Sequence, residues 1–155
     1  MVNLIVAIGV NNIIGKDNDL PWSYKEDLQY FKQTTLNKTV VMGERTFQSI
    51  FGMNKKLLPN RKMVVATHNP DFKFEGVEVI YDLVKYLKET KEDVFVIGGG
   101  QIYRASLPYV QRLYITHVNK EYEGNVFFPE IDYSLYNKIS QRDSGDLSFC
   151  VYERK

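Results

Sequence analysis

The sequence predicts a single-domain α/β fold: a mixed, mostly parallel eight-stranded sheet with about four helices on both faces. Short runs of consecutive apolar residues, typical of strands buried on both faces, recur along the chain. Over roughly the first two thirds of the chain these runs alternate with helical segments, which favours parallel strands joined by right-handed crossovers. The last segments are two strands around Ser144-Gly145-Asp146, which predicts an antiparallel C-terminal hairpin.

The composition is that of one globular domain spanning residues 1–155. The formal net charge is +1, and basic residues are scattered among acidic ones, so no nucleic-acid-binding face is expected. No apolar run approaches the roughly 20 residues of a membrane span, and the amino terminus enters an apolar strand without a charged leader. Cys150 is the only cysteine, which suits a reducing compartment. We therefore expect a cytoplasmic protein that binds neither nucleic acid nor membrane.

The first strand is predicted at residues 4–10, and its continuous apolar character places it in the middle of the sheet. Residues 11–20 are rich in Asn, Asp and Gly, which predicts a loop. This loop is long for a connection, and long ordered loops often act as lids over a site.

A helix is predicted over residues 24–34. Ser23 and Glu26 have the spacing of a capping box, in which the serine caps the helix and the glutamate reaches back to the serine amide. Polar residues occupy one side of this helix, so the other side should face the protein interior.

Asp27 lies on that face, in a stripe shared with Tyr24, Leu28 and Phe31. An isolated carboxylate on a buried stripe is unfavourable unless its pKa is raised or it is hydrogen-bonded. The alternative is an ordinary surface aspartate, stabilised by the dipole of the first helical turn. This segment alone leaves both interpretations open.

The remaining elements follow in order along the chain. Asp82 is a candidate cap for one helix, and Pro108 ends another. Further strands are predicted at residues 39–42, 62–67, 77–80, 94–97, 113–118, 136–142 and 149–154, with a short extended segment at 126–129. Helices are predicted around Thr46, Phe47 and Ile50 (a short one), after Asp82 as far as Thr90, and from Gln101 to Leu107.

Two predicted strands end in glycine directly before a helix. Gly43 follows residues 39–42, and Gly98-Gly99-Gly100 follows residues 94–97. Glycine lets a ligand approach the backbone, and ligands of open α/β sheets bind at the carboxyl ends of the strands. Two such junctions favour a long phosphate-bearing ligand such as a dinucleotide. Ordinary tight turns are the alternative, since Tyr103 occupies the last glycine position of the G-x-G-x-x-G pattern.

Other kinds of catalysis lack the residues they need. His68 and His117 are the only histidines, and with Cys150 and the acids they show no metal-ligand spacing, so no metal site is expected. No nucleophile motif is present. His117 lies within a predicted strand and is expected to be packed rather than catalytic. Asp27 is then the best candidate for handling a proton, and a lone acid suits a reaction that needs one.

A set of motifs extends over nearly the whole chain, residues 4–154. In this order and spacing the motifs resemble those of dihydrofolate reductases of the bacterial chromosomal or phage-borne type. They are Ile14-Gly15, Leu20-Pro21-Trp22, Asp27-Leu28-x-x-Phe31-Lys32, Val41-Met42-Gly43-x-x-Thr46-Phe47-x-Ser49-Ile50, Leu58-Pro59-Asn60-Arg61, Ile97-Gly98-Gly99-Gly100-x-Ile102-Tyr103, and Tyr114-Ile115-Thr116 with Gly124 and Phe128-Pro129.

The resemblance implies reduction of 7,8-dihydrofolate to tetrahydrofolate with NADPH, for one-carbon metabolism and thymidylate synthesis. A hydride passes from nicotinamide C4 to pterin C6, and a proton reaches N5. Asp27 is implied to bind the pterin amino group and N3 and to promote protonation of N5 through water. Thr116 would hydrogen-bond Asp27, and Trp22 would hold an ordered water. The enzyme is expected to be a monomer.

The resemblance also implies the binding residues. Ile5 and Ile97 would offer carbonyls to the pterin amino group, and Arg61 would bind the glutamate α-carboxylate in bidentate fashion. Gly98-Gly99 is expected to be a cis peptide. The implied catalytic residues are Asp27, Trp22, Thr116 and Leu20. Those for substrate are Ile5, Ala7, Asp27, Leu28, Phe31, Lys32, Ile50, Leu58, Arg61, Ile97, Tyr103 and Thr116. Those for cofactor are Ala7, Ile14, Gly15, Asn18, Leu20, Gly43, Arg45, Thr46, Thr67, His68, Ile97, Gly98, Gly99, Gly100, Gln101, Ile102 and Tyr103.

Two positions depart from the family pattern. Many relatives carry a basic residue directly after the Gly43 equivalent, where it meets the cofactor 2′-phosphate, and this chain has Glu44. A second commonly basic position, after the glycine triplet, is Gln101. A carboxylate near the 2′-phosphate is unfavourable unless it turns away. The hypothesis is that Arg45, His68 and Thr67 recognise the 2′-phosphate and that discrimination against NADH is weaker than usual. Arg45 could alternatively serve only the diphosphate.

Two alternatives remain at this point. A pyrimidine reductase of riboflavin synthesis shares the general fold type, but should lack the combination of Trp22, Asp27 and Phe31. A pterin- or dinucleotide-binding module without turnover should have lost Asp27 or Arg61. An assay with NADPH and dihydrofolate, with inhibition by a diaminopyrimidine antifolate, distinguishes these possibilities.

Overall fold

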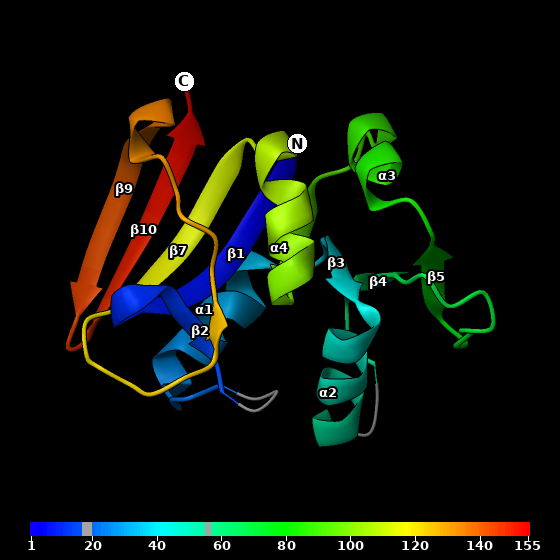
Figure 1. Cartoon of the computed structure of the whole chain (residues 1–155), viewed down its shortest axis with the longest axis horizontal. Coiled ribbons are helices and arrows are strands. Elements are labelled where there is room, and N and C mark those ends of the chain that lie inside the picture. The colour runs from blue at the N-terminus through cyan, green and yellow to red at the C-terminus, as the bar shows by residue number, and fades with distance from the viewer. Residues whose placement is uncertain (17–19, 55–56) are drawn as a thin grey trace.

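A twisted eight-stranded sheet forms the centre of the computed structural model, which describes residues 1–16, 20–54 and 57–155 (Figure 1). Its strands are β1 (Val2–Gly9), β3 (Thr39–Gly43), β4 (Lys62–Ala66), β5 (Val77–Ile80), β6 (Val94–Gly98), β7 (Arg112–Val118), β9 (Tyr136–Ser144) and β10 (Leu147–Arg154).

The strand order is β5-β4-β3-β6-β1-β7-β10-β9. β1 lies between β6 and β7 and runs parallel to both, so the prediction that the first strand is central is confirmed. β10 runs antiparallel to β7 and to β9, which gives the mixed sheet with the C-terminal hairpin that the sequence predicts. The carboxyl ends of β1, β3, β4 and β6 therefore meet at one edge of the sheet.

Helices cover both faces of the sheet, as predicted. In Figure 1, α4 lies in front of the strands and α1 lies behind them. The alternating side chains of β1 enter two cores: Leu4 and Val6 pack in the core that includes Tyr103, whereas Ile5 packs in the one that includes Phe47. The helices are α1 (Lys25–Thr34), α2 (Glu44–Asn54), α3 (Leu83–Glu89) and α4 (Gly100–Ser106), with 3-10 turns η1 (Val10–Asn12), η2 (Leu107–Tyr109) and η3 (Tyr133–Leu135).

Local sequence signals predicted several elements with nearly the observed bounds. β5 has the predicted bounds, and the Asp82 side chain accepts a hydrogen bond from the Lys85 amide at 3.1 Å, as expected of a helix cap. α2 differs, because it extends over 11 residues and begins at Glu44 rather than forming a short helix around Thr46.

The predicted capping box before α1 is wrong. The helix begins at Lys25, Tyr24 occupies the cap position, and no side chain caps it. Glu26 instead accepts hydrogen bonds from Ser144 Oγ at 2.7 Å and Arg142 Nη1 at 3.0 Å, on the C-terminal hairpin. These two bonds lower the pKa of Glu26, and they attach α1 to β9.

The predicted loop over residues 11–20 contains a short strand, β2 (Ile13–Gly15), which pairs antiparallel with β8 (Val126–Phe127). The Asn125 amide donates to the Gly15 carbonyl at 3.0 Å, and the Phe128 amide donates to the Asn12 carbonyl at 2.8 Å. This pairing joins the segment before α1 to a distant part of the chain. The loop prediction therefore missed an ordered strand.

No helix within the described ranges has both the length and the apolar character needed to cross a membrane.

Gly124 and Gly52 provide a matched pair of alanine substitutions with opposite expected effects. A Cβ at Gly124 would approach the Ile13 side chain and lie 2.6 Å from the Gly15 carbonyl oxygen, which is too close without movement of β2. Gly124→Ala should lower the free energy of unfolding by about 1–3 kcal/mol. A Cβ at Gly52, exposed in α2, would meet nothing within 4 Å. Gly52→Ala should raise stability by about 0.5–1 kcal/mol. Urea denaturation measures both, and equal effects would contradict the close contact.

Candidate active site at the carboxyl edge of the sheet

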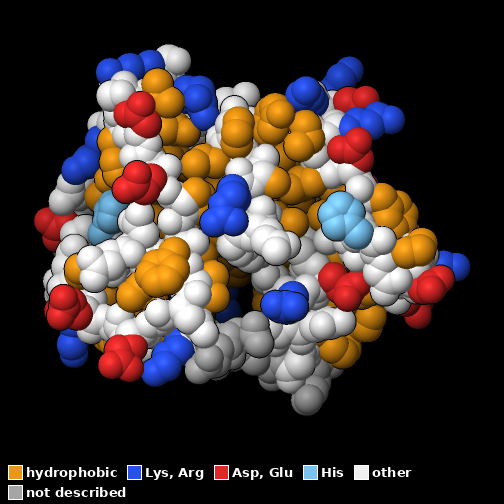
Figure 2. All heavy atoms as spheres, in the orientation of Figure 1, with side chains coloured by type: hydrophobic (Ala, Val, Ile, Leu, Met, Phe, Trp, Pro, Cys, Tyr) orange, Lys and Arg blue, Asp and Glu red, His pale blue; other side chains and the backbone are white. Residues whose placement is uncertain are grey.

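The candidate site is assembled from α1, β7 and the strand ends of β1, β3, β4 and β6. Figure 2 shows that this face of the molecule is hollowed near its middle, close to the lower end of α4 in the view of Figure 1. Leu28 and Leu20 are each 49 % exposed, which is high for large apolar side chains. Leu28 was expected on a buried stripe, and that expectation is wrong, since no residue of α1 is fully buried. The apolar face of α1 is instead open to a ligand.

Asp27 is half-buried on α1, and burial raises the pKa of its carboxyl above the ordinary value. The Thr116 hydroxyl on β7 acts in the opposite direction and favours the ionised form. Burial also raises the pKa of the Tyr30 and Tyr103 phenols, and the charge of Asp27 adds to this in both cases. These four groups therefore lie within electrostatic reach of one another.

Trp22 Nε1 is buried and lacks a hydrogen-bond partner among the described residues. A buried N–H or hydroxyl is unfavourable without a partner, so such atoms usually face a ligand or a bound water. The Trp22 ring is held in place by Tyr122, whose centroid is 5.5 Å away, and by Gly9, where a Cβ would lie 3.0 Å from Trp22 Cζ3. The arrangement fits a small polar ligand beside Asp27.

The Tyr103 hydroxyl donates a hydrogen bond to the Ile5 carbonyl at 2.9 Å, in the interior of the protein. A carbonyl oxygen has two lone pairs, so this bond leaves Ile5 able to accept a second one. Tyr103 is 6 % exposed, so its hydroxyl reaches the site by positioning the Ile5 carbonyl rather than by contacting a ligand at the surface.

The two glycine junctions lie side by side, because β3 and β6 are neighbours and Met42 pairs with Gly98. Gly98 has φ 130°, a conformation that favours glycine, and the Gly98-Gly99 peptide is cis, as the resemblance implied. A Cβ at Gly99 would lie 3.3 Å from Thr46 Oγ1, and one at Gly43 would lie 3.0 Å from Ile102 Cγ1. Side chains at these positions would crowd the turns, so the edge offers bare backbone that fits a diphosphate.

Arg61 lies at the outer end of α1, before β4. Its Nε donates to Thr35 Oγ1 at 2.9 Å, Nη1 to the Pro59 carbonyl at 2.6 Å, and Nη2 to the Lys32 carbonyl. These bonds use three of the five N–H groups of the guanidinium. The remaining two can bind a carboxylate in bidentate fashion.

Glu44 lies at the other end of the edge, where β3 leads into α2. Its carboxylate accepts a hydrogen bond from Thr67 Oγ1 at 3.0 Å, and Gln48 Nε2 lies 3.5 Å from it. Arg45, His68 and Gln101, which follow β3, β4 and β6 respectively, are exposed.

The other predicted residues differ in how far they are exposed. Ala7, Ile14, Phe31, Ile50, Leu58, Ile97 and Ile102 are half-buried, Gly15 is buried, and Gly100 is half-buried at the start of α4. Lys32 is exposed, and its backbone carbonyl accepts a hydrogen bond from Arg61. Asn18 lies outside the described residues.

Sequence reasoning missed Tyr30 and the group formed by Tyr24, Tyr122 and Asp146. Tyr30 stands three residues after Asp27 on α1, a spacing that could have indicated its proximity. The Tyr24 and Tyr122 hydroxyls are 2.8 Å apart, and Tyr24 also donates to Asp146 Oδ2 at 3.2 Å. No local signal indicates this group, because its members come from three distant segments.

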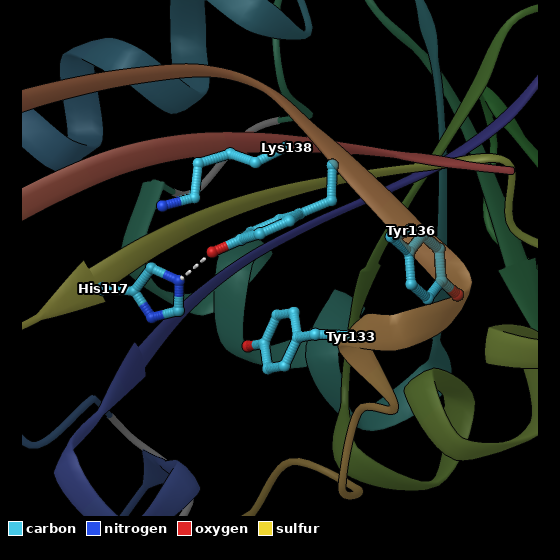
Figure 3. A pocket seen from close by; sticks show the side chains of 5 residues that line it. His117, Tyr133, Tyr136 and Lys138 are labelled. Atoms are coloured by element: carbon cyan, nitrogen blue, oxygen red, sulfur yellow. Dashed lines mark hydrogen bonds between the residues drawn. The ribbon is translucent and has the colours of Figure 1, made fainter.

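A separate cavity of about 420 Å³ is lined by His117, Tyr133, Tyr136, Lys138 and Tyr152 (Figure 3). Thr116 and His117 are consecutive on β7, so their side chains point to opposite faces of the sheet, and this cavity lies away from Asp27. His117 Nε2 is 2.9 Å from the Tyr152 hydroxyl, and burial lowers its pKa, which fits the packed role predicted for it. No cluster of possible metal ligands occurs in the described part of the chain.

Comparison with known proteins gives one consistent family. A family model described as dihydrofolate reductase matches residues 1–154. The chain is 41 % identical to the dihydrofolate reductase of Bacillus subtilis, with 100 % of the chain and 95 % of that protein covered. It is 35 % identical to that of Staphylococcus haemolyticus, with 99 % and 95 % covered. A solved dihydrofolate reductase of Enterococcus faecalis, complexed with NADP(H) and RAB-propyl, superposes with a TM-score of 0.87 at 32 % identity, covering 100 % of this chain and 96 % of that one.

The raised pKa of Asp27 predicts a pH-dependent effect on stability. Because the folded state holds this proton more tightly than the unfolded chain does, the ionised carboxylate destabilises the fold at neutral pH. Asp27→Asn should therefore raise the free energy of unfolding at neutral pH. The difference should shrink as the pH falls through the raised pKa toward the ordinary value of 3.8, where wild-type Asp27 is also neutral.

Urea denaturation of both proteins across this pH range measures the effect. Asp71→Asn, at an exposed position outside the site, is the control. A destabilised Asp27→Asn variant at neutral pH, or a difference that is constant with pH, would contradict the assigned environment.

Proposed function

The chain belongs to the dihydrofolate reductase family, and we propose that it reduces 7,8-dihydrofolate to 5,6,7,8-tetrahydrofolate with NADPH, using Asp27 to bind the pterin and to direct a proton to N5. The observation that carries this proposal is the half-buried Asp27 carboxylate, with a raised pKa, beside the buried Thr116 hydroxyl. NADPH, when bound, supplies the hydride that is added to C6 of the pterin.

The Asp27 carboxylate accepts hydrogen bonds from the pterin amino group and N3–H, which together form an amidine-like edge. Such charge-assisted bonds are strong in a partly dry site. They also compensate the burial that raises the carboxyl pKa, so substrate and carboxylate stabilise each other. The Ile5 carbonyl, with one lone pair already used by Tyr103, accepts a further bond from the same amino group, and the Ile97 carbonyl is proposed to do likewise.

Proton delivery to N5 uses the two buried polar atoms beside Asp27. The Thr116 hydroxyl donates to the carboxylate and fixes its orientation. The Trp22 N–H, which is buried and has no partner among the described residues, holds a water between Asp27 and N5. Protonation of N5 makes the C=N bond a better hydride acceptor, so a single acid is enough for this reaction.

The rest of the substrate follows the outer face of α1. Leu28, Phe31, Ile50 and Leu58 form an apolar wall for the benzoyl group. Arg61 binds the glutamate α-carboxylate with its two remaining N–H groups, while its other three hold the guanidinium against Thr35, Pro59 and Lys32. The fixed guanidinium is preorganised for a bidentate contact.

The cofactor would be held along the carboxyl edge by the bare backbone at Gly98, Gly99 and Gly43, with the Thr46 hydroxyl facing the turn after β6. Ala7, Ile14 and Leu20 would contact the nicotinamide. We also propose that the chain works as a cytoplasmic monomer that does not bind nucleic acid, which its net charge of +1 and single buried cysteine support.

Replacement of Asp27 tests the chemical assignment. Asp27→Asn should reduce turnover with NADPH and dihydrofolate at neutral pH by about 10²–10⁴-fold, because the variant cannot promote protonation of N5. The loss of NADPH absorbance measures turnover, and circular dichroism checks the fold. Asp71→Asn should retain wild-type turnover. Near-normal activity in Asp27→Asn would rule out the proposed role.

Arg61 is tested by comparing two substrates. Arg61→Lys should raise KM for dihydrofolate about 10–100-fold, because a lysine ammonium cannot replace the bidentate fork. The same variant should show little change with 7,8-dihydropteroate, which lacks the glutamate. An equal KM increase for both substrates would mean that Arg61 only supports the structure of Thr35 and Lys32.

A further inference from the structure

Glu44 presents a fixed carboxylate at the edge of the sheet. It is the first residue of α2 and is half-buried. Its Oε1 accepts a hydrogen bond from the Thr67 hydroxyl, which follows β4, at 3.0 Å. Gln48, one turn further along α2, approaches Oε2 at 3.5 Å. These contacts hold the carboxylate between the ends of β3 and β4.

The order of strands determines which part of a bound dinucleotide meets Glu44. Asp27 faces β7, and the strands then follow as β1, β6, β3 and β4. If the nicotinamide lies beside the pterin, as proposed above, and the diphosphate passes the glycine turns after β6 and β3, then the adenosine ribose lies at the ends of β3 and β4. The ribose is therefore next to Glu44 and Thr67.

We propose that Glu44 accepts a hydrogen bond from the adenosine ribose 2′-hydroxyl, and that the enzyme consequently uses NADH as a hydride donor at a rate comparable to that with NADPH. This inference rests on the proposed function. A carboxylate at the end of a strand is the group that binds the ribose 2′-hydroxyl in NAD-specific dinucleotide folds. The same carboxylate repels the 2′-phosphate of NADPH.

The partners of Thr67 strengthen this assignment. Its hydroxyl hydrogen is donated to Glu44, and its oxygen accepts a hydrogen bond from the Asn69 amide at 3.0 Å. The hydroxyl therefore has no hydrogen left to donate to a 2′-phosphate. Of the residues that the sequence suggests for the 2′-phosphate, Arg45 and His68 remain, and both are exposed. They attract the phosphate through solvent, which offsets part of the repulsion and keeps NADPH a substrate.

The NADH-dependent reaction has the same balance as the NADPH-dependent one. The C4–H bond of the dihydronicotinamide breaks, and its electron pair forms the new C–H bond at C6 of 7,8-dihydrofolate. The C=N bond becomes a single bond, N5 takes one proton from solvent, and NADH leaves as NAD⁺. Only the group on the adenosine ribose differs between the two donors.

Binding of the oxidised cofactors tests the inference without turnover. Isothermal titration of wild-type protein with NADP⁺ and NAD⁺ should give dissociation constants within about tenfold of each other. Glu44→Gln, which keeps the shape of the side chain and removes its charge, should strengthen NADP⁺ binding about tenfold or more and leave NAD⁺ binding equal or weaker. Glu44→Arg should increase the preference for NADP⁺ over NAD⁺ further. Glu89→Gln, at an exposed position on α3, is the matched control and should leave both constants unchanged.

Fragments isolate the ribose from the rest of the cofactor. Adenosine 2′,5′-bisphosphate should gain affinity in Glu44→Gln, whereas AMP should not. Steady-state assays should give kcat/KM values for NADH and NADPH within about tenfold in wild type. This inference would be overturned, with the proposed function intact, if wild type bound NADP⁺ more than about 100-fold more tightly than NAD⁺. It would also be overturned if Glu44→Gln left the ratio of the two dissociation constants unchanged. Binding of both cofactors without reduction of dihydrofolate by either would overturn the proposed function and the NADH activity together.

Discussion

Keeping the Asp27 carboxylate half-buried is the constraint on which the site depends. Burial disfavours its charge, and the Thr116 hydroxyl on β7 only partly offsets this. α1 must therefore be held firmly against the sheet, or the carboxylate would move into water. The hydrogen bonds that Glu26 accepts from Ser144 and Arg142 hold the first turn of α1 against the hairpin. The Tyr30 and Phe149 rings, whose centroids are 4.6 Å apart, hold its middle. Burial of the Asp27 charge destabilises the fold, and the contacts that hold α1 against the sheet offset this.

The strands and the helix α3 were predictable because their signals are local. Apolar runs mark β1, β3, β4 and β6, and the cap of α3 lies three residues from the amide that it binds. The errors concern contacts between distant segments. β2 forms because Ile13 meets Phe127, and Glu26 leaves its expected capping role because Ser144, 118 residues away, binds it. No periodicity within residues 11–26 carries this information.

The candidate site shows the same division. The glycine turns and Asp27 are visible in the sequence because their residue types are unusual where they stand. That Leu28 is exposed rather than buried could not be read from the sequence, since helical periodicity identifies an apolar face but not what covers it. Likewise Glu44 is recognisable as a departure from the family pattern, but its bond to Thr67 follows only from the neighbouring positions of β3 and β4.

The central place of β1 has a consequence during synthesis of the chain. Leu4 is in register with Val96 on one side and with Leu113 on the other, so β1 waits longer for its neighbours than any other strand of the sheet. At a translation rate of about 5–20 residues per second, an apolar segment remains without its sheet partners for about 5–20 s. During that time it exposes unpaired backbone and apolar side chains to other nascent chains. Chaperone capture of the amino-terminal segment would protect this protein more than protection of any later strand.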